Sequence, residues 1–77
     1  MKTLVYEVAV TKESDGRWSA ECPALPGCAT WGDSERDALK NVREAVEAYV
    51  EDLVKAGETV PAGREIIQVP AVSVMTA

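Results

Sequence analysis

The 77-residue chain contains no histidine. Because histidine is the commonest general base and a very common metal ligand, its absence removes the most frequent routes to acid–base catalysis and zinc binding. Cysteine is scarce too: Cys22 and Cys28 are the two in the chain, and their Cys-x5-Cys spacing is not that of a zinc finger. We therefore expect no metal and no cofactor, and we interpret Cys28 as a small packed residue, not a nucleophile.

Long apolar runs are also missing. No stretch approaches the roughly 20 apolar residues that a membrane span needs. Glu7 interrupts the N-terminal segment before the apolar region of a signal peptide can form. The sequence therefore predicts a cytoplasmic protein with no membrane partner, in which Cys22 and Cys28 stay reduced. Their spacing would also permit a disulfide.

Basic residues are few: 8 lysines and arginines stand against 13 aspartates and glutamates, for a net charge of −5. Direct binding to nucleic acid usually needs a basic patch, so we do not expect it here. An acidic chain suits a basic protein partner, because complementary charge speeds encounter. Plain solubility explains the same charge, and composition alone does not separate the two readings.

The glycines form no phosphate-binding motif, which leaves carboxylates as the available chemistry. Glu7 and Glu21 each alternate with apolar residues and could stand across from each other on neighbouring strands. Two-metal nucleases of the ribonuclease H type use carboxylates from a comparable arrangement. The same alternation is typical of a solvated sheet face, and we interpret both residues in that way. The sequence therefore predicts a protein that is not an enzyme.

The first half of the chain predicts three strands. Residues 4–11 and 17–22 alternate between apolar and polar side chains, and the turn at 13–16 carries an Asp-Gly pair, so the two segments should form an antiparallel hairpin. Residues 23–27 contain two prolines, which lack the amide donor of a sheet ladder, and so form a loop. Residues 28–31 follow as a short third strand.

A single amphipathic helix is predicted within residues 32–57. Ser34 is placed to cap its first turn, with Asp37 three residues on, and Gly57 supplies the C-terminal stop. Apolar residues recur at steps of three and four, which is one face of a helix. This stripe consists of Leu39, Val42, Val46, Tyr49 and Leu53, widened by Ala38, Ala45, Val50 and Val54.

The β-branched residues within 64–69 predict a fourth strand, which Pro70 interrupts and 72–74 resume at an edge. A strand reached through a helix should run parallel to an earlier strand by a right-handed crossover. The sequence thus predicts one α+β domain over 1–77: a β-β-β-α-β mixed four-stranded sheet, in the order 3-2-1-4, with one long helix on one face.

One helix covers only one face of such a sheet. We expect Val5, Ala9 and Trp31 on the uncovered face, although Trp31 ends its strand and suits a core position equally well. Trp18 lies on the apolar side of its strand and is predicted to be core. A domain of this size buries only about 60% of its unfolded surface, so we expect a homodimer or larger homo-oligomer.

Several segments together resemble the HicB antitoxin family. The resemblance covers residues 4–61, and its most specific part is Leu25-Pro26-Gly27-Cys28 followed by Gly32-Asp33-Ser34. The other segments are Tyr6-Glu7-Val8, Asp15-Gly16, Trp18-Ser19-Ala20, Pro23-Ala24, Ala38-Leu39 and Glu44-Ala45. The resemblance implies a truncated ribonuclease H-like fold of the order β-β-β-α-β. It also implies binding to HicA, a small basic RNA-cleaving toxin that uses a histidine.

The resemblance makes an antitoxin-like module that occludes a HicA-type toxin the leading prediction. We assign partner binding to Trp31, Val5, Glu7 and Glu21, on the uncovered face and its rim. The alternative is a stand-alone oligomeric HicB-like domain with a regulatory or structural role and no toxin. Many HicB proteins carry a C-terminal DNA-binding segment; the residues after Gly63 leave no room for one, so we expect none here.

Overall fold

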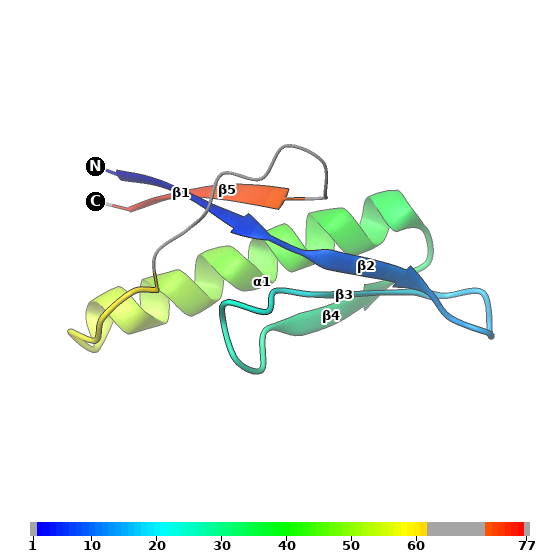
Figure 1. The fold of residues 1–77 in the computed structure, drawn as a ribbon, viewed down its shortest axis with the longest axis horizontal. Helices are drawn as coiled ribbons and strands as arrows, with labels where there is room; N and C mark the ends of the chain where they lie inside the picture. The colour runs from blue at the N-terminus through cyan, green and yellow to red at the C-terminus, as the bar shows by residue number, and fades with distance from the viewer. Residues whose placement is uncertain (1, 62–70, 77) are drawn as a thin grey trace.

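The computed structural model describes residues 2–61 and 71–76, and these form an α+β fold with a single hydrophobic core (Figure 1). No helix within these ranges is long and apolar enough to cross a membrane. The elements in chain order are β1 (Lys2–Glu7), β2 (Ala9–Lys12), β3 (Trp18–Glu21), β4 (Ala29–Gly32), α1 (Glu35–Lys55) and β5 (Ala71–Thr76).

The strands form two antiparallel sheets. β2, β3 and β4 make a three-stranded sheet in that order, and β1 pairs with β5. The helix lies against β2, β3, β4 and β5, so it supports one side of both sheets (Figure 1). The two sheets are joined through Val8, which is 1% exposed between β1 and β2.

The predicted strand order was wrong. The first predicted strand is divided at Val8, because β1 and β2 pair with different strands. The last strand is antiparallel to the first, not parallel to it. The parallel prediction assumed a strand soon after the helix, whereas β5 begins only at Ala71, well beyond Lys55. The predicted strand at 64–69 lies outside the described residues.

The helix was predicted correctly, and its caps explain its limits. The Asp37 backbone N–H donates to Ser34 Oγ over 3.1 Å, which satisfies one free amide of the first turn. At the other end Gly57 has a φ of +70°, the left-handed conformation that ends many helices. Local features therefore set both ends of the helix: the Ser34 cap at the start and the left-handed Gly57 at the end.

The buried face of α1 is narrower than the predicted stripe. Leu39, Tyr49 and Leu53 are only half-buried, and Val54 is 48% exposed, so its assignment to the stripe was wrong. The fully buried row repeats every four residues and has small or β-branched side chains, which allow a close approach to the sheets. This row consists of Ala38, Val42, Val46 and Val50.

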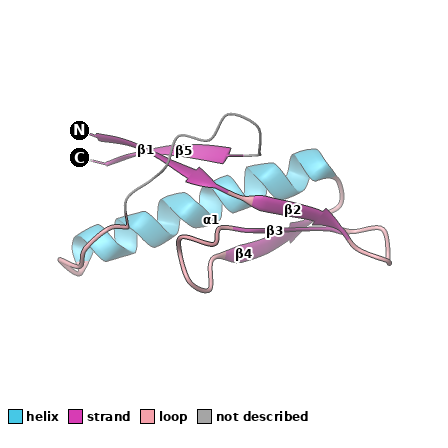
Figure 2. Cartoon of the chain, viewed as in Figure 1, coloured by secondary structure: helices cyan, strands magenta, loops and turns pink. Residues whose placement is uncertain are grey.

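The loop between β3 and β4 contributes to the core directly (Figure 2). Leu25, at its centre, is 0% exposed. The Cys22 N–H donates to the Cys28 carbonyl over 2.9 Å, which extends the β3–β4 ladder into the base of the loop. Two further backbone bonds, from Leu25 to Cys22 and from Cys28 to Leu25, hold the loop compact. Both cysteines are buried and unbridged.

Candidate functional site: the outer face of the three-stranded sheet

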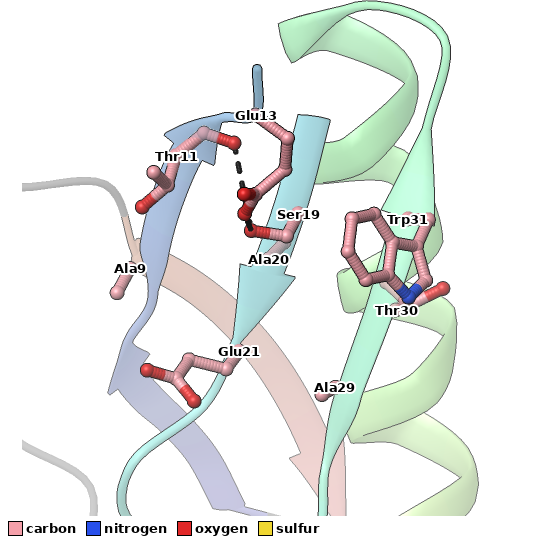
Figure 3. Close-up of a pocket in the computed structure, with 9 residues that line it drawn as sticks. All are labelled: Ala9, Thr11, Glu13, Ser19, Ala20, Glu21, Ala29, Thr30 and Trp31. Carbon is pink, nitrogen blue, oxygen red and sulfur yellow. Dashed lines mark hydrogen bonds between the residues drawn. The ribbon is translucent and has the colours of Figure 1, made fainter. Parts of the chain in front are cut away.

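The side of β2, β3 and β4 that faces away from α1 presents two rows of side chains (Figure 3). Strand register defines both rows, because directly paired residues point to the same side of a sheet. One row is Ala9, Glu21 and Ala29; the other is Thr11, Ser19 and Trp31. We call this surface the outer face.

Small residues hollow out the outer face. Glu21 lies directly between two alanines, Ala9 on β2 and Ala29 on β4, while the large indole of Trp31 stands beside them. The result is a shallow depression of about 380 Å³. Figure 3 shows the Glu21 carboxylate reaching over the β2 side and the Trp31 ring over the β4 side of this hollow.

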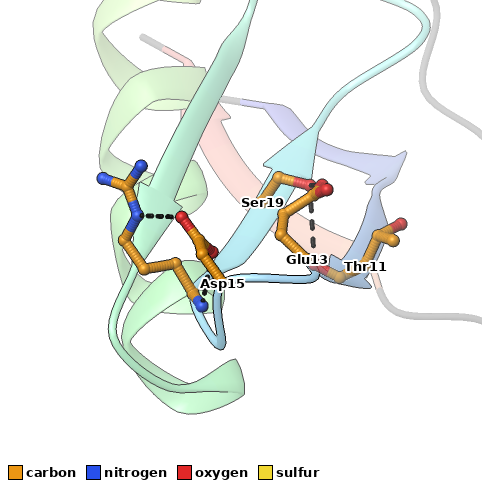
Figure 4. A network of polar contacts seen from close by, with 5 residues as sticks. Thr11, Glu13, Asp15 and Ser19 are labelled. Carbon is orange, nitrogen blue, oxygen red and sulfur yellow. Dashed lines mark hydrogen bonds and ion pairs between the residues drawn. The ribbon is translucent and has the colours of Figure 1, made fainter.

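The charged residues that line the hollow are acidic. Glu13 and Glu21 contribute carboxylates, and neither forms an ion pair with a described residue. Glu13 Oε1 accepts a bond of 2.7 Å from the Ser19 hydroxyl, which holds it above the sheet (Figure 4). The Glu21 carboxylate is exposed and has no hydrogen bond to the described side chains. The hollow therefore offers negative charge to an incoming group.

Arg17, a cation close to Trp31, is already engaged. Its Nε lies 3.1 Å from Asp15 Oδ2 at the hairpin turn, and its guanidinium carbon lies 5.2 Å from the centroid of the Trp31 ring. The hydrogen bonds from Arg17 hold the pKa of the Asp15 carboxyl below its usual range. Arg17 lines a second, smaller depression, which Trp31 also borders, and does not line the hollow of the outer face. The guanidinium therefore leaves the acidic hollow unneutralised.

Trp31 borders both depressions and is 50% exposed. Its carbonyl accepts a bond of 2.7 Å from Asn41 Nδ2 of α1, so the adjacent edge of β4 is partly capped by the helix. An exposed indole on a rigid strand is a common anchor at protein interfaces. The capped edge makes the outer face, more than the β4 edge, the available surface for a partner.

Two of the four predicted partner-binding residues, Trp31 and Glu21, lie together at the hollow. Val5 and Glu7 are on β1 in the other sheet and do not line it. Val5 is half-buried, and Glu7 is exposed. Sequence reasoning missed Glu13, which was assigned to the turn; its position two residues after Thr11, on the same side of the strand, was the available signal.

The pair of facing carboxylates that the sequence left open as an alternative, Glu7 opposite Glu21, is not formed. Glu21 stands opposite Ala9, and Glu7 is paired with Ala71 in the other sheet. Among the residues that the structure describes, no three cysteine, aspartate or glutamate side chains come close enough to share a metal ion. The arrangement of the two glutamates is that of a solvated sheet face.

The two cysteines lack the environment of a nucleophile. Burial raises the pKa of both thiols above the ordinary value of 9.0, whereas a reactive cysteine needs a lowered pKa. The pKa of the Tyr6 phenol is raised above 10.0, mainly by burial, and its hydroxyl donates to the Pro61 carbonyl over 2.7 Å. All three groups are therefore held in their neutral forms.

These shifts predict a loss of stability at alkaline pH. The unfolded chain ionises first as pH rises through about 9, so it binds fewer protons than the folded chain and the free energy of unfolding falls. Below that pH the contribution is constant. Urea denaturation at pH 7, 8, 9 and 10 measures how the free energy of unfolding changes with pH. The double variant Cys22→Ala/Cys28→Ala should show a shallower decline, and an equally steep decline would contradict the assignment to the thiols.

The sequence of this chain matches a protein family and several known proteins. The family model described as "HicB-like antitoxin of bacterial toxin-antitoxin system" matches residues 6–73. A UPF0150 protein of Thermoplasma acidophilum is 46% identical over 58 residues, which are 75% of this chain and 84% of that protein. A UPF0150 protein of Synechocystis is 43% identical over 56 residues, 73% of this chain and 71% of its own length.

Two solved structures are similar as well. The N-terminal domain of the Burkholderia pseudomallei antitoxin HicB superposes with a TM-score of 0.75 at 26% identity, covering 96% of this chain and 99% of that one. The structure of the antitoxin HicB from the same organism gives a TM-score of 0.71 at 27% identity. It covers 99% of this chain, which spans only 64% of that HicB chain.

Proposed function

The chain belongs to the HicB-like antitoxin family, and on that premise we propose that it binds and occludes a basic ribonuclease toxin of the HicA type. The family match over residues 6–73 is the observation that carries this proposal. The close superposition on the N-terminal domain of a HicB antitoxin supports it. The proposed role is one of binding, without catalysis by this chain, and it takes place in the cytoplasm, where such a toxin would meet its RNA.

The outer face supplies a surface suited to this role. It carries an exposed indole, Trp31, and the carboxylate of Glu21, which forms no ion pair with a described residue. The whole chain has a net charge of −5, which favours encounter with a basic protein and opposes direct binding to nucleic acid. Val5 and Glu7, on the neighbouring sheet, extend the proposed contact beyond the hollow.

The test uses the gene next to the one that encodes this chain. If that gene encodes a small basic protein, its expression alone should arrest growth, and co-expression of this chain should restore colony formation. The two proteins should also co-purify through a tag on either one. A tagged unrelated acidic protein of similar size is the control for charge alone. Failure both to restore growth and to form a complex would contradict the proposal.

A second candidate is a stand-alone homo-oligomeric domain with a regulatory role. Relative size favours it, because the matches span 84% and 71% of the two UPF0150 proteins, which are thus little more than this domain. In both readings we expect one domain over residues 1–77 and a homodimer or larger assembly, since so small a core is marginal alone. A neighbourhood with no gene for a small basic protein would favour this candidate.

A further inference from the structure

We propose that the hollow of the outer face receives an arginine side chain of the protein partner, which pairs with Glu21 and packs against Trp31. The inference rests on the proposed function and names the contact through which it works. The hollow provides about 380 Å³ between these two side chains, with alanines on either side of Glu21. Both residues that pair directly with Glu21, Ala9 and Ala29, are alanines, so neither fills the space beside its carboxylate.

The negative charge of the hollow favours a cationic side chain as its occupant. Glu13 and Glu21 are the charged residues that line the hollow, and Glu7 is an exposed carboxylate on the neighbouring strand β1. None of the three forms an ion pair with a described residue. The nearby guanidinium of Arg17 is paired with Asp15 and does not line the hollow. A basic side chain would therefore meet uncompensated negative charge in the hollow.

Shape favours arginine over lysine. A guanidinium is flat, binds a carboxylate through two parallel N–H donors and stacks on an aromatic face, whereas an ammonium does neither as well. One guanidinium already lies against this indole, because the Arg17 guanidinium carbon is 5.2 Å from the ring centroid. Trp31 borders both depressions, so the indole that contacts Arg17 also forms part of the wall of the hollow.

A second copy of this chain is a poorer occupant. In a two-fold symmetric contact through the outer face the same patch meets itself, so the Glu13 and Glu21 carboxylates of both copies would share one interface. Like charges brought together in an interface oppose association. Homo-oligomers of the chain are thus expected to use another surface and to leave the hollow free for a partner.

The binding experiment compares variants of this chain against the neighbouring-gene toxin by calorimetry. Glu21→Gln, Trp31→Ala and Ala29→Leu remove the charge, the aromatic wall and the free volume in turn, and each should raise Kd at least about tenfold. The matched controls, Glu44→Gln and Ala48→Leu, alter exposed residues on α1 and should change Kd less than about twofold. Raising the salt concentration should weaken the wild type more than Glu21→Gln.

A peptide probe separates this inference from the proposed function. Tetra-arginine added to the 15N-labelled chain should shift the Trp31 indole N–H and Glu21 resonances more than tetra-lysine does, and Glu21→Gln should reduce the shift. If the toxin fails to bind but the peptide maps to the hollow, the toxin proposal fails and the arginine site stands. If the toxin binds and the three variants match the controls, or the peptide maps elsewhere, the arginine site is overturned.

Discussion

Replacing Gly32 by alanine is expected to lower the free energy of unfolding by about 3 kcal/mol, a large share of the stability of so small a domain. The cause is a steric clash at the point where β4 meets the start of α1. A Cβ at this position would collide with the backbone N of Ala38, and it would lie 2.7 Å from Asp37 C and 2.8 Å from Ala38 Cα. Backbone atoms of a capped helix turn cannot move aside as a flexible side chain can.

Gly16→Ala is the matched control for this variant. Gly16 lies at the tip of the hairpin with a φ of +89°, and an added Cβ meets nothing within 4 Å, so only backbone strain of about 1 kcal/mol is expected. Urea denaturation followed by far-UV circular dichroism measures both variants. Equal losses would show that the contact between β4 and α1 is looser than it appears in the structure.

The clash at Gly32 also concerns the candidate site. Trp31 precedes this glycine, and the bond from Asn41 to the Trp31 carbonyl depends on the same close approach of β4 to α1. Pushing the strand away from the helix would weaken that bond and turn the indole relative to the hollow. We therefore expect Gly32→Ala to weaken partner binding even at temperatures where the variant remains folded.

Local patterns in the sequence were sufficient to predict the hairpin and the helix. Gly16 takes the positive φ that an Asp-Gly turn needs, and Ser34 caps the helix as expected. Both features depend on residues within a few positions of one another. The α+β class followed from the order of these elements, and the match to HicB structures confirms it.

Local patterns were not sufficient to predict the position and the pairing direction of the last strand. The segment 64–69 and the segment that forms β5 both contain β-branched residues, and nothing local indicates which of them pairs with β1. Pairing direction depends on the length of chain between Lys55 and Ala71, and a rule for short crossovers does not apply there.

The candidate site could be predicted only in part for a similar reason. Alternation placed Glu21 at an exposed position and left Trp31 between a core and an exposed one, and the neighbours of both depend on register across three strands. The hollow exists because Glu21 pairs with Ala9 and Ala29, and a shift of one residue would turn these side chains to the other face. The β3–β4 register depends on the loop between these two strands, and local patterns do not predict the geometry of that loop.

That loop gives the second large prediction: Leu25→Ala should lower the free energy of unfolding by about 3 to 4 kcal/mol. Leu25 is 0% exposed although it lies in a loop rich in proline and glycine, so its removal leaves a cavity in the core between the sheet and α1. The backbone bonds of the loop, from Leu25 to Cys22 and from Cys28 to Leu25, resist the collapse that would fill this cavity.

Leu53→Ala provides the comparison. Leu53 is only half-buried near the end of α1, so this variant should lose about 1 kcal/mol of the free energy of unfolding. Urea denaturation at pH 7 measures both variants, and equal losses would contradict a core role for the loop. Leu25→Ala should also broaden the Trp31 indole resonance below the unfolding transition, because the loop fixes the β3–β4 register that places Trp31 opposite Ser19. Leu53→Ala should leave that resonance unchanged, since it lies outside the ladder that forms the site.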